Sequence, residues 1–394
     1  MINMRATQHT DELLFIRKAK VEQKSLRYYG MVSIILHMYG MDVTRKLRTL
    51  YRILSKLHDV WMHLMAVYLV SRYILLYFWS IVPIELIFGS IVSIAFPITL
   101  HYSIKSKRQL LSNVLMHYRK MFNVLAQKSA KNNNRVKVNI TITAILLLSI
   151  ISAALSALSM RSNKVTHLSY SLFVDLGDDT VRITFCLFMI QMIYAYQYAF
   201  PCFVAFMCGF LYYEFSELLD RFRETLASHD TVLNNDKIIP TVQLYTSLFK
   251  LAHKLHDAIS QPTFFLLCTQ VTVMFCAIAM FFQKSMEKTP TPVLCRSGLI
   301  LLLAPASIIG LVLCASRISK QRQEIQMIFM LLKDRSIGQG HYGADIMSCL
   351  DSVTEKQLPI MTASGVVQLT PNVALGMFGS LFSYSLLILS LIQK

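Results

Sequence analysis

Long stretches without charge constrain this chain more than any other feature. Uncharged windows cover residues 86–104, 138–160, 183–213, 258–283, 297–316 and 357–393, and a further apolar stretch at about residues 59–80 carries Arg72 in its middle. Each window reaches the roughly 20 residues that a helix needs to cross a bilayer. With 54% hydrophobic and 15% charged residues, the chain has too little polar surface to cover itself in water. The sequence therefore predicts an all-α membrane protein with seven transmembrane helices.

The basic residues assign an orientation to these helices. If the amino end is cytosolic, residues 1–58, 105–137, 211–257 and 317–356 are cytosolic and contain 31 of the 39 Lys and Arg residues. The external loops, 161–181 and 284–296, contain five, namely Arg161, Lys164, Lys284, Lys288 and Arg296. This bias is the positive-inside signature, and the polar first 25 residues do not resemble a signal peptide. We expect a cytosolic N-terminus and an extracellular C-terminus, the inverse of a G-protein-coupled receptor.

The charge pattern also suggests how the chain is divided. Residues 1–58 form a cytosolic N-terminal region, and residues 59–316 hold transmembrane helices one to six. Apolar residues at helical intervals indicate that 105–137 and 211–257 extend two of these helices into the cytosol, beside anionic lipid headgroups or against another subunit. Residues 317–369 form a cytosolic anchor segment, and residues 370–394 form the last transmembrane helix.

Several function classes lack their signatures in this sequence. There is no GxSxG, HExxH, P-loop or paired CxxC motif, and the eight cysteines show neither a disulfide framework nor metal-ligand spacing. We therefore expect no enzyme activity, no cofactor and no metal site. The net charge of +17 is spread along membrane-facing loops rather than on a soluble fold with stacking aromatics, which argues against nucleic-acid binding.

Two charges lie inside the expected transmembrane helices, Arg72 within the first and Glu85 directly before the uncharged window of the second. A charge at this depth is costly unless it is paired or faces water, so each is a candidate functional residue. Two roles remain open. The residues either snorkel or pair for structural reasons, or they line a water-filled cavity that a ligand can reach.

The fourth apolar window contains the best candidates for a ligand pocket. Phe185, Phe188 and Gln191 lie in its external half, where their three-residue spacing places them on a shared helix face, and Tyr194 follows them in the same window as a further candidate. Aromatic walls with a few hydrogen-bonding groups are typical of small-molecule sites, although ordinary packing of aromatic residues explains the pattern too. Such a wall favours an apolar or alkaloid-like ligand.

The last helix has its own pattern. Thr370 followed by Pro371 predicts a helix start, so a helix should run from about 371 to 392. One narrow stripe on it consists of Gly376, Ser380, Ser383, Leu387, Ser390 and Lys394, with Leu391 at its flank. Small residues at this spacing allow close helix packing. Alternatively, the stripes of several symmetric subunits face a shared aqueous pore, with leucines as an apolar constriction.

The carboxyl-terminal residues resemble a signature of the insect gustatory receptors, members of the seven-span arthropod chemoreceptor superfamily. That signature is Thr-Tyr, five apolar residues, then Gln-Phe. Here Ser383 and Tyr384 match its start, residues 385–389 fill the middle, and Ser390 and Leu391 stand at the Gln-Phe positions. The upstream run TASGVVQLTPNVALGMFGSLFSY and the segment LRYYGMVS near the amino end are also similar to the family.

The resemblance implies a ligand-gated, non-selective cation channel in the plasma membrane, a homotetramer or a heteromer with related subunits, opened by a small-molecule tastant. It implies a central pore lined by the last helix, in which Leu387 and Leu391 form the gate and Ser390 lines its neck. Serine is shorter than the family's glutamine and lacks its amide, so the neck at this position differs in width or hydration. A secondary transporter or a G-protein-coupled type of receptor is the alternative, although the internal repeats typical of transporters are absent from the sequence.

Overall fold

The structure is a computed structural model, and it describes residues 48–79, 84–125, 133–159, 168–174, 177–228, 235–283, 291–339 and 344–392. Most of the expected N-terminal region 1–58 therefore lies outside the described residues, as does Lys394. The side chains of Glu85 and Leu391 lie outside the described part as well, although both residues belong to helices.

The described chain is almost entirely helical. In order along the chain, its elements are α3 (Arg48–Phe78), α4 (Ile84–Leu125), α5 (Asn133–Ser159), α7 (Asp179–Tyr194), η4 (Ala195–Ala199), α8 (Phe200–Ser228), α9 (Asn235–Gln283), α10 (Thr291–Gln339), α11 (Ala344–Glu355), β1 (Thr362–Ala363), β2 (Val367–Gln368) and α12 (Pro371–Ile392). Elements α7, η4 and α8 follow one another without a break and form a single rod.

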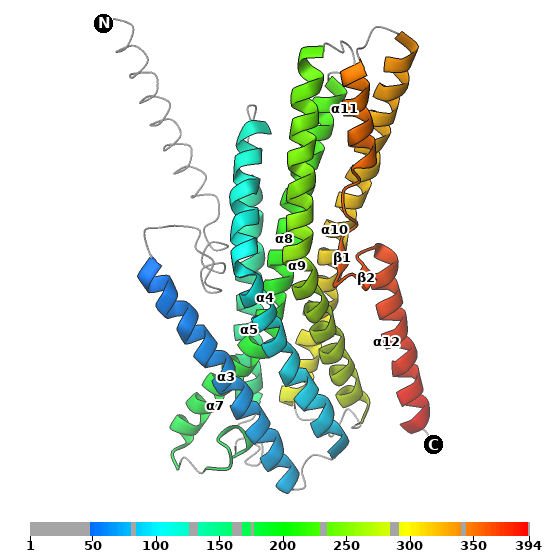
Figure 1. The fold of residues 1–394 in the computed structure, drawn as a ribbon. Helices are drawn as coiled ribbons and strands as arrows, with labels where there is room; N and C mark the ends of the chain where they lie inside the picture. Colours follow the sequence, from blue (N-terminus) through cyan, green and yellow to red (C-terminus); the bar gives the residue numbers. More distant parts are fainter. Residues whose placement is uncertain are drawn as a thin grey trace, which may run out of the picture.

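The helices run back and forth along one bundle (Figure 1). Among the described residues, five segments are long and apolar enough to cross a membrane, namely Ile53–Phe78, Val136–Leu158, Thr180–Ala227, Ile238–Met280 and Leu294–Arg335. The helices α4 and α12 complete the set of seven by their place beside these segments (Figure 1). The prediction of an all-α membrane protein is confirmed.

Two helices are far longer than a bilayer is thick. The helices α9 and α10 have 49 residues each, which at 1.5 Å per residue gives roughly 74 Å, against about 30 Å of hydrocarbon. Together with α4 and α8 they extend beyond the other helices at one end of the bundle, the upper end in Figure 1, where α11 packs against α9 and α10. We call the opposite half of the bundle, which contains the α3–α4 and α9–α10 connections, the outer half.

The projecting helices are joined by polar contacts between α8 and α10. Arg223 pairs with Glu324, and Arg317 Nη2 donates to Glu217 Oε1 at 3.1 Å. The side-chain amide of Gln321 donates a further hydrogen bond from α10 to α8. Below them, one continuous apolar core runs through the bundle.

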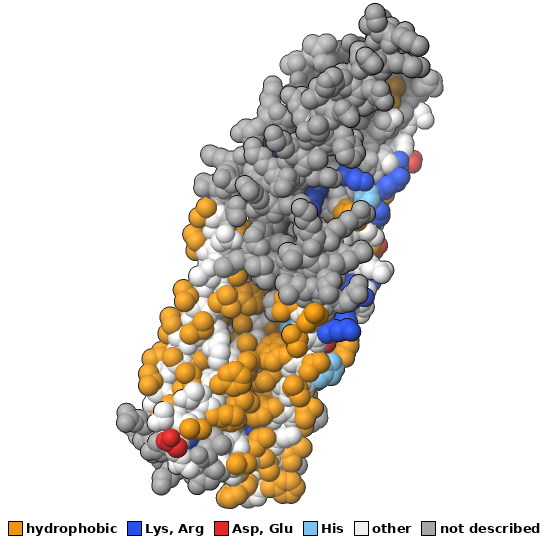
Figure 2. Space-filling view, turned by 90° about the vertical axis from the view of Figure 1, so that its left-hand side faces the viewer, with side chains coloured by type: hydrophobic (Ala, Val, Ile, Leu, Met, Phe, Trp, Pro, Cys, Tyr) orange, Lys and Arg blue, Asp and Glu red, His pale blue; other side chains and the backbone are white. Residues whose placement is uncertain are grey.

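The exposed surface of the bundle shows which part of it meets lipid. Figure 2 shows hydrophobic side chains over the lower part of one face, with Lys and Arg side chains gathered above them. The exposed apolar residues include several from α3, namely Val60, Leu64, Val67 and Phe78. A contiguous apolar surface of this kind needs a non-aqueous neighbour, and the lipid hydrocarbon provides it.

A short hairpin connects the projecting region to the last helix. Strand β1 pairs with β2 in an antiparallel register that sets Thr362 opposite Gln368. Its turn uses two consecutive left-handed residues, Ser364 at φ 55° and Gly365 at φ 71°. The backbone N–H of Ser364 donates to the carbonyl oxygen of Ser260 at 3.0 Å and lies 2.8 Å from its hydroxyl, so the hairpin is bonded to α9.

Candidate functional site

In the outer half of the bundle, the half-buried Arg296 of α10 meets three buried residues, Tyr73 of α3 and Gln197 and Tyr198 of η4, and we call these four residues the outer cluster. Arg296 is its centre. Its Nη2 donates to Gln197 Oε1 at 3.0 Å, its Nη1 donates to the Tyr73 hydroxyl at 3.4 Å, and its Nε donates to the Tyr198 hydroxyl. The Tyr198 hydroxyl in turn donates to Gln197 Oε1 at 3.0 Å. Three helical rods therefore meet at a single guanidinium.

A π-helical turn positions two members of this cluster. The segment Ala195–Ala199 is π-helical, and Tyr196, Gln197, Tyr198 and Ala199 are all buried. A π-turn inserts a residue into the helix and so rotates the neighbouring side chains, a device found often at functional sites. Tyr196 uses the rotation to donate to the carbonyl oxygen of Ile94 at 2.8 Å, which fixes η4 against α4.

The position of Arg296 corrects one expectation. The sequence placed this residue at the end of the external loop 284–296, because the uncharged window begins only at residue 297. In the structure α10 begins at Thr291, so Arg296 lies in its second turn and reaches into the bundle. Hydropathy cannot distinguish an arginine that ends a loop from one that begins a helix. The available signal is its position at the edge of an apolar stretch, where long basic side chains reach polar partners.

Arg72 contacts an external loop. Its Nε donates to the carbonyl oxygen of Ser169 at 3.2 Å, its Nη2 donates to the Ser169 hydroxyl at 3.3 Å, and its guanidinium carbon lies 4.0 Å from the centre of the Tyr170 ring. Tyr68, one helical turn earlier, donates to the carbonyl oxygen of Tyr170 at 2.7 Å. These contacts hold residues 168–174 against α3.

The predicted ligand residues separate into two groups. Tyr194 is buried, shares a 2.9 Å hydrogen bond with the Ser156 hydroxyl, and lies with its ring centre 5.4 Å from that of Tyr198, so it borders the outer cluster. Gln191 donates to the Ser149 hydroxyl at 3.3 Å, between α7 and α5.

The remaining three predicted ligand residues are not brought to the outer cluster by any described contact. Phe185 and Phe188 are 37% and 54% exposed, so their rings face away from the bundle interior. Glu85 lies in the first turn of α4, and its side chain is outside the described part. Their assignment as ligand contacts stays a prediction.

A small cavity lies beside Arg296. Its volume is about 10 Å³, enough for roughly one water molecule. It is lined by Ser93, Val273, Cys276, Ala277, Met280, Arg296, Ser297 and Ile300. A ligand larger than water therefore needs side chains around this cavity to move.

The last helix contacts the rest of the chain along a single edge. It touches α9 and α10, where Ala374 and Leu381 are buried. The predicted pore stripe is exposed at Gly376, Ser380, Ser383, Leu387 and Ser390, although Gly376 and Ser380 also line an open groove beside α9. Figure 1 shows α12 at the side of the bundle, next to α9 and α10.

The stripe does not pack closely within the chain. A Cβ added at Gly376 would meet nothing within 4 Å, so none of the described helices uses the glycine for close approach. The Ser380 and Ser390 hydroxyls donate to the carbonyl oxygens of Gly376 and Leu387, at 2.9 and 2.8 Å. Each hydroxyl oxygen can still accept a hydrogen bond from water.

An open apolar groove separates α12 from α9 over part of their length. Its volume is about 650 Å³. It is lined by Phe96, Phe264, Leu267, Cys268, Val271, Thr272, Phe275, Val367, Gly376, Met377, Ser380, Leu381 and Tyr384. Phe275 and Tyr384 stack across it with ring centres 3.9 Å apart, so contact between the two helices includes one aromatic pair.

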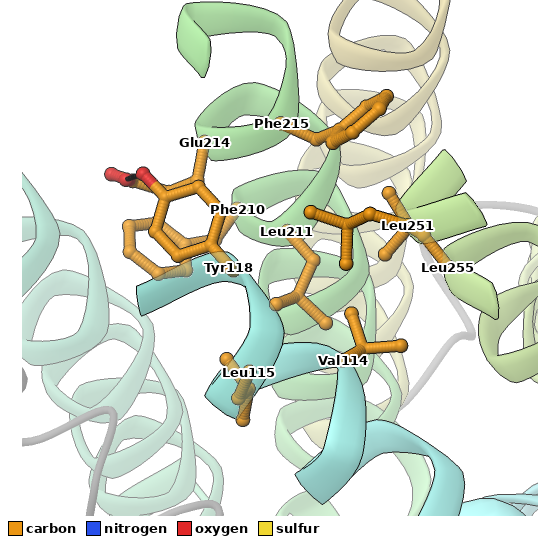
Figure 3. Close-up of a pocket in the computed structure, with 9 residues that line it drawn as sticks. All are labelled: Val114, Leu115, Tyr118, Phe210, Leu211, Glu214, Phe215, Leu251 and Leu255. Atoms are coloured by element: carbon orange, nitrogen blue, oxygen red, sulfur yellow. Dashed lines mark hydrogen bonds between the residues drawn. The ribbon is translucent and has the colours of Figure 1, made fainter. Parts of the chain in front are cut away.

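A second small pocket lies further from the outer half, among α4, α8 and α9 (Figure 3). Apolar side chains line most of it, and Tyr118 donates a hydrogen bond to Glu214 at its edge. Its volume of about 10 Å³ leaves no room for a ligand. We assign this Tyr–Glu pair to the joining of α4 and α8.

Comparison with known proteins shows a likeness of fold. No protein-family model matches the chain, and no curated protein sequence matches it. Two solved structures of the insect olfactory receptor OR5 from Machilis hrabei share its fold. The structure in complex with eugenol has a TM-score of 0.57 at 12% identity, and the structure solved without it has a TM-score of 0.51 at 11% identity. Each likeness covers 94% of this chain and 99% of the receptor chain.

Proposed function

We propose that this protein is a gustatory-type chemoreceptor, a ligand-gated, non-selective cation channel of the plasma membrane. One observation carries the proposal. The chain shares its fold with an insect olfactory receptor over almost its whole length, while the stripe of small and hydroxyl residues on its last helix makes no close contact within the chain. An exposed stripe of small and hydroxyl residues on a membrane helix is suited to face water, and symmetric copies of the same stripe around an axis enclose such an aqueous path.

In this proposal four subunits, identical or related, each contribute α12 to one central pore. Ser383 and Ser390 present hydroxyl groups to the ions, while Leu387 and Leu391 form the apolar constriction. Lys394 lies at the external mouth. Ser390 stands where a glutamine is expected, so the neck here is lined by a shorter, hydroxyl group.

The ligand is a small molecule that binds in the outer half of each subunit. The OR5 receptor has been solved in complex with eugenol, a small molecule, which supports this class of ligand for the shared fold. Of the residues proposed to contact it, Tyr194 of α7 borders the outer cluster. Gln191, Phe185 and Phe188 also lie on α7, and Glu85 lies on α4.

A physical route from ligand to gate passes through α9. This helix supplies Met280 beside Arg296, and it also holds Ser260, to which the hairpin before α12 is bonded. A ligand that favours one position of α9 thereby favours one position of α12. The gate opens when the ligand binds the open arrangement more tightly than the closed one.

The proposal is tested by cysteine substitution in α12, which has no native cysteine. Ser383 and Phe382 are neighbours, and both are exposed in the single chain. They differ by about 100° around the helix axis. In cells that express the full chain, a charged thiol reagent should block the cation current of Ser383→Cys and leave that of Phe382→Cys unchanged.

The unsubstituted protein, treated with the same reagent, controls for the eight native cysteines. Equal block of both variants, or of neither while surface labelling shows that both react, contradicts the pore assignment. A current that follows a solute gradient rather than the cation gradient identifies a carrier instead.

A further inference from the structure

The outer half holds one buried arginine, Arg72, and one half-buried arginine, Arg296, and neither has an acidic partner among the described residues. Arg72 is 9% exposed and contacts a carbonyl, a hydroxyl and an aromatic ring. Arg296 contacts two tyrosine hydroxyls and an amide oxygen. A buried cation that contacts only neutral groups keeps most of its desolvation cost, because dipoles offset that cost less than an opposite charge does.

The outer cluster also has more donors than acceptors. A guanidinium carries five N–H groups, and three of those on Arg296 are used by neutral acceptors. The side chain of Gln197 is 2% exposed, and its amide nitrogen has no hydrogen-bond partner in the described structure. Arg296 and Gln197 therefore both carry N–H groups that no described acceptor uses. A buried donor without a partner costs about 1–3 kcal/mol, so a ligand that brings acceptors into the cluster is favoured.

We propose that the outer cluster binds the carboxylate of a small-molecule ligand, with Arg296 as its ion partner and Gln197 as an additional amide donor. The inference deepens the proposed function, and it rests on that proposal only for the link from binding to current. A carboxylate is acceptor-only, carries the missing charge, and matches the planar fork of a guanidinium. Ser297, which lines the cavity beside Arg296, supplies a further hydroxyl group.

The same charges act against a cationic ligand. The aromatic wall alone favoured an apolar or alkaloid-like compound, but an ammonium group in the outer cluster would lie next to an unpaired guanidinium. Like charges brought together at low dielectric repel strongly. The apolar body of the ligand can still contact Tyr194, whose ring centre lies 5.4 Å from that of Tyr198 in the cluster.

Entry of the carboxylate requires a local rearrangement. The cavity beside Arg296 holds about 10 Å³, which is less than a carboxylate needs. Met280 lines it and is only half-buried, and its unbranched side chain changes conformation at little cost. Because Met280 belongs to α9, opening of the cavity acts on the helix that also holds the hairpin before α12.

Thermal stabilisation of the purified full chain measures binding without relying on a current. The probes are hexanoate, benzoate and cinnamate, each compared at neutral pH with its primary amide and with the corresponding amine. We expect at least one carboxylate to raise the unfolding temperature at a concentration tenfold lower than its amide requires, with no stabilisation by the amine. If every carboxylate is inert, or if an amide or amine does as well, the inference is wrong.

Substitutions locate the effect. Arg296→Gln should raise the required concentration of that carboxylate at least tenfold, and Arg296→Lys should raise it less because the charge remains. Arg317→Gln is the matched control, because this arginine lies on the same helix but pairs with Glu217 in the projecting region, and it should change nothing. Unchanged stabilisation of Arg296→Gln overturns the assignment.

Gln197→Glu keeps the test decisive if Arg296→Gln does not fold. It places a carboxylate within reach of Arg296 without changing side-chain size. It should raise the unfolding temperature of the free protein and abolish stabilisation by the ligand. If this variant still binds the carboxylate as the unsubstituted protein does, the inference fails. Carboxylate binding without any current contradicts the channel proposal alone, and current evoked only by neutral or cationic ligands contradicts the carboxylate site alone.

Discussion

At the scale of single residues, Arg72 shows how one buried charge can fix a loop. It makes two hydrogen bonds to Ser169 and stacks on Tyr170, while Tyr68 adds a bond to the same loop. Hydrogen bonds to charged groups contribute about 1.5–3 kcal/mol each when the donor is removed from a buried site. Because Arg72→Gln removes the charged donor of these bonds, we expect it to lower the free energy of unfolding by about 2–3 kcal/mol.

Thermal unfolding in detergent micelles measures this loss. Tyr68→Phe is the matched comparison, because it removes a single neutral hydrogen bond and should cost about 1 kcal/mol. Arg72→Lys should fall between the two. If Arg72→Gln is no less stable than Tyr68→Phe, the arginine does not hold the loop.

Individual residues are also where the sequence is least informative. Arg72 stands out because it interrupts an apolar stretch, so its importance can be read from one window. Arg296 has no such contrast, since its partners Tyr73 and Gln197 lie 223 and 99 positions away along the chain. A contact of that kind depends on how three helices meet. No local pattern contains that information.

At the scale of elements, the hairpin before α12 depends on one backbone conformation. Gly365 has φ 71°, and a Cβ added there would meet no atom within 4 Å. The cost of Gly365→Ala is therefore one of backbone strain alone, about 1–2 kcal/mol. We expect a lower unfolding temperature together with a right-shifted dose response, because the strained turn loosens the bond between Ser364 and α9.

A helical glycine provides the control for this prediction. Gly310 in α10 likewise has open space around its added Cβ, but its backbone is helical. Alanine is favoured over glycine in a helix interior by about 0.5–1 kcal/mol. Gly310→Ala should thus leave the unfolding temperature unchanged or raise it. Equal destabilisation by both substitutions would show that the turn conformation is unimportant.

Elements were more predictable than contacts because their signals are local. The helix expected at 371–392 coincides with α12, since Thr370 and Pro371 determine its start through short-range geometry. The extension of the second apolar window into a basic segment follows from apolar spacing alone, and α4 continues to Leu125. By contrast, the π-turn at Ala195–Ala199 has no known sequence signal in a single chain, and only its buried tyrosines hint at it.

At the scale of the whole molecule, an odd number of crossings places the start of α3 and the end of α12 at opposite faces of the membrane (Figure 1). Charge bias and fold likeness both agree with this arrangement, although they rest on different observations. The bias depends on lysines and arginines outside the hydrocarbon, while the likeness at 12% identity depends on the path of the backbone.

The last property belongs to the assembly rather than to one chain. Leu387 is 55% exposed in the single subunit, so the described residues leave much of this large apolar side chain uncovered. If copies of this leucine meet around the axis, they exclude water from the closed pore and so prevent ion passage. Replacing it with a small polar residue admits water, and Leu387→Ser should therefore raise the basal cation current several-fold. The measurement is the ligand-free current in cells with equal surface expression.

Leu386→Ser is the matched variant, because this neighbour is 54% exposed and lies on another face of α12, and it should leave the basal current unchanged. Equal behaviour of the two variants would place Leu387 against lipid and remove the gate from this position.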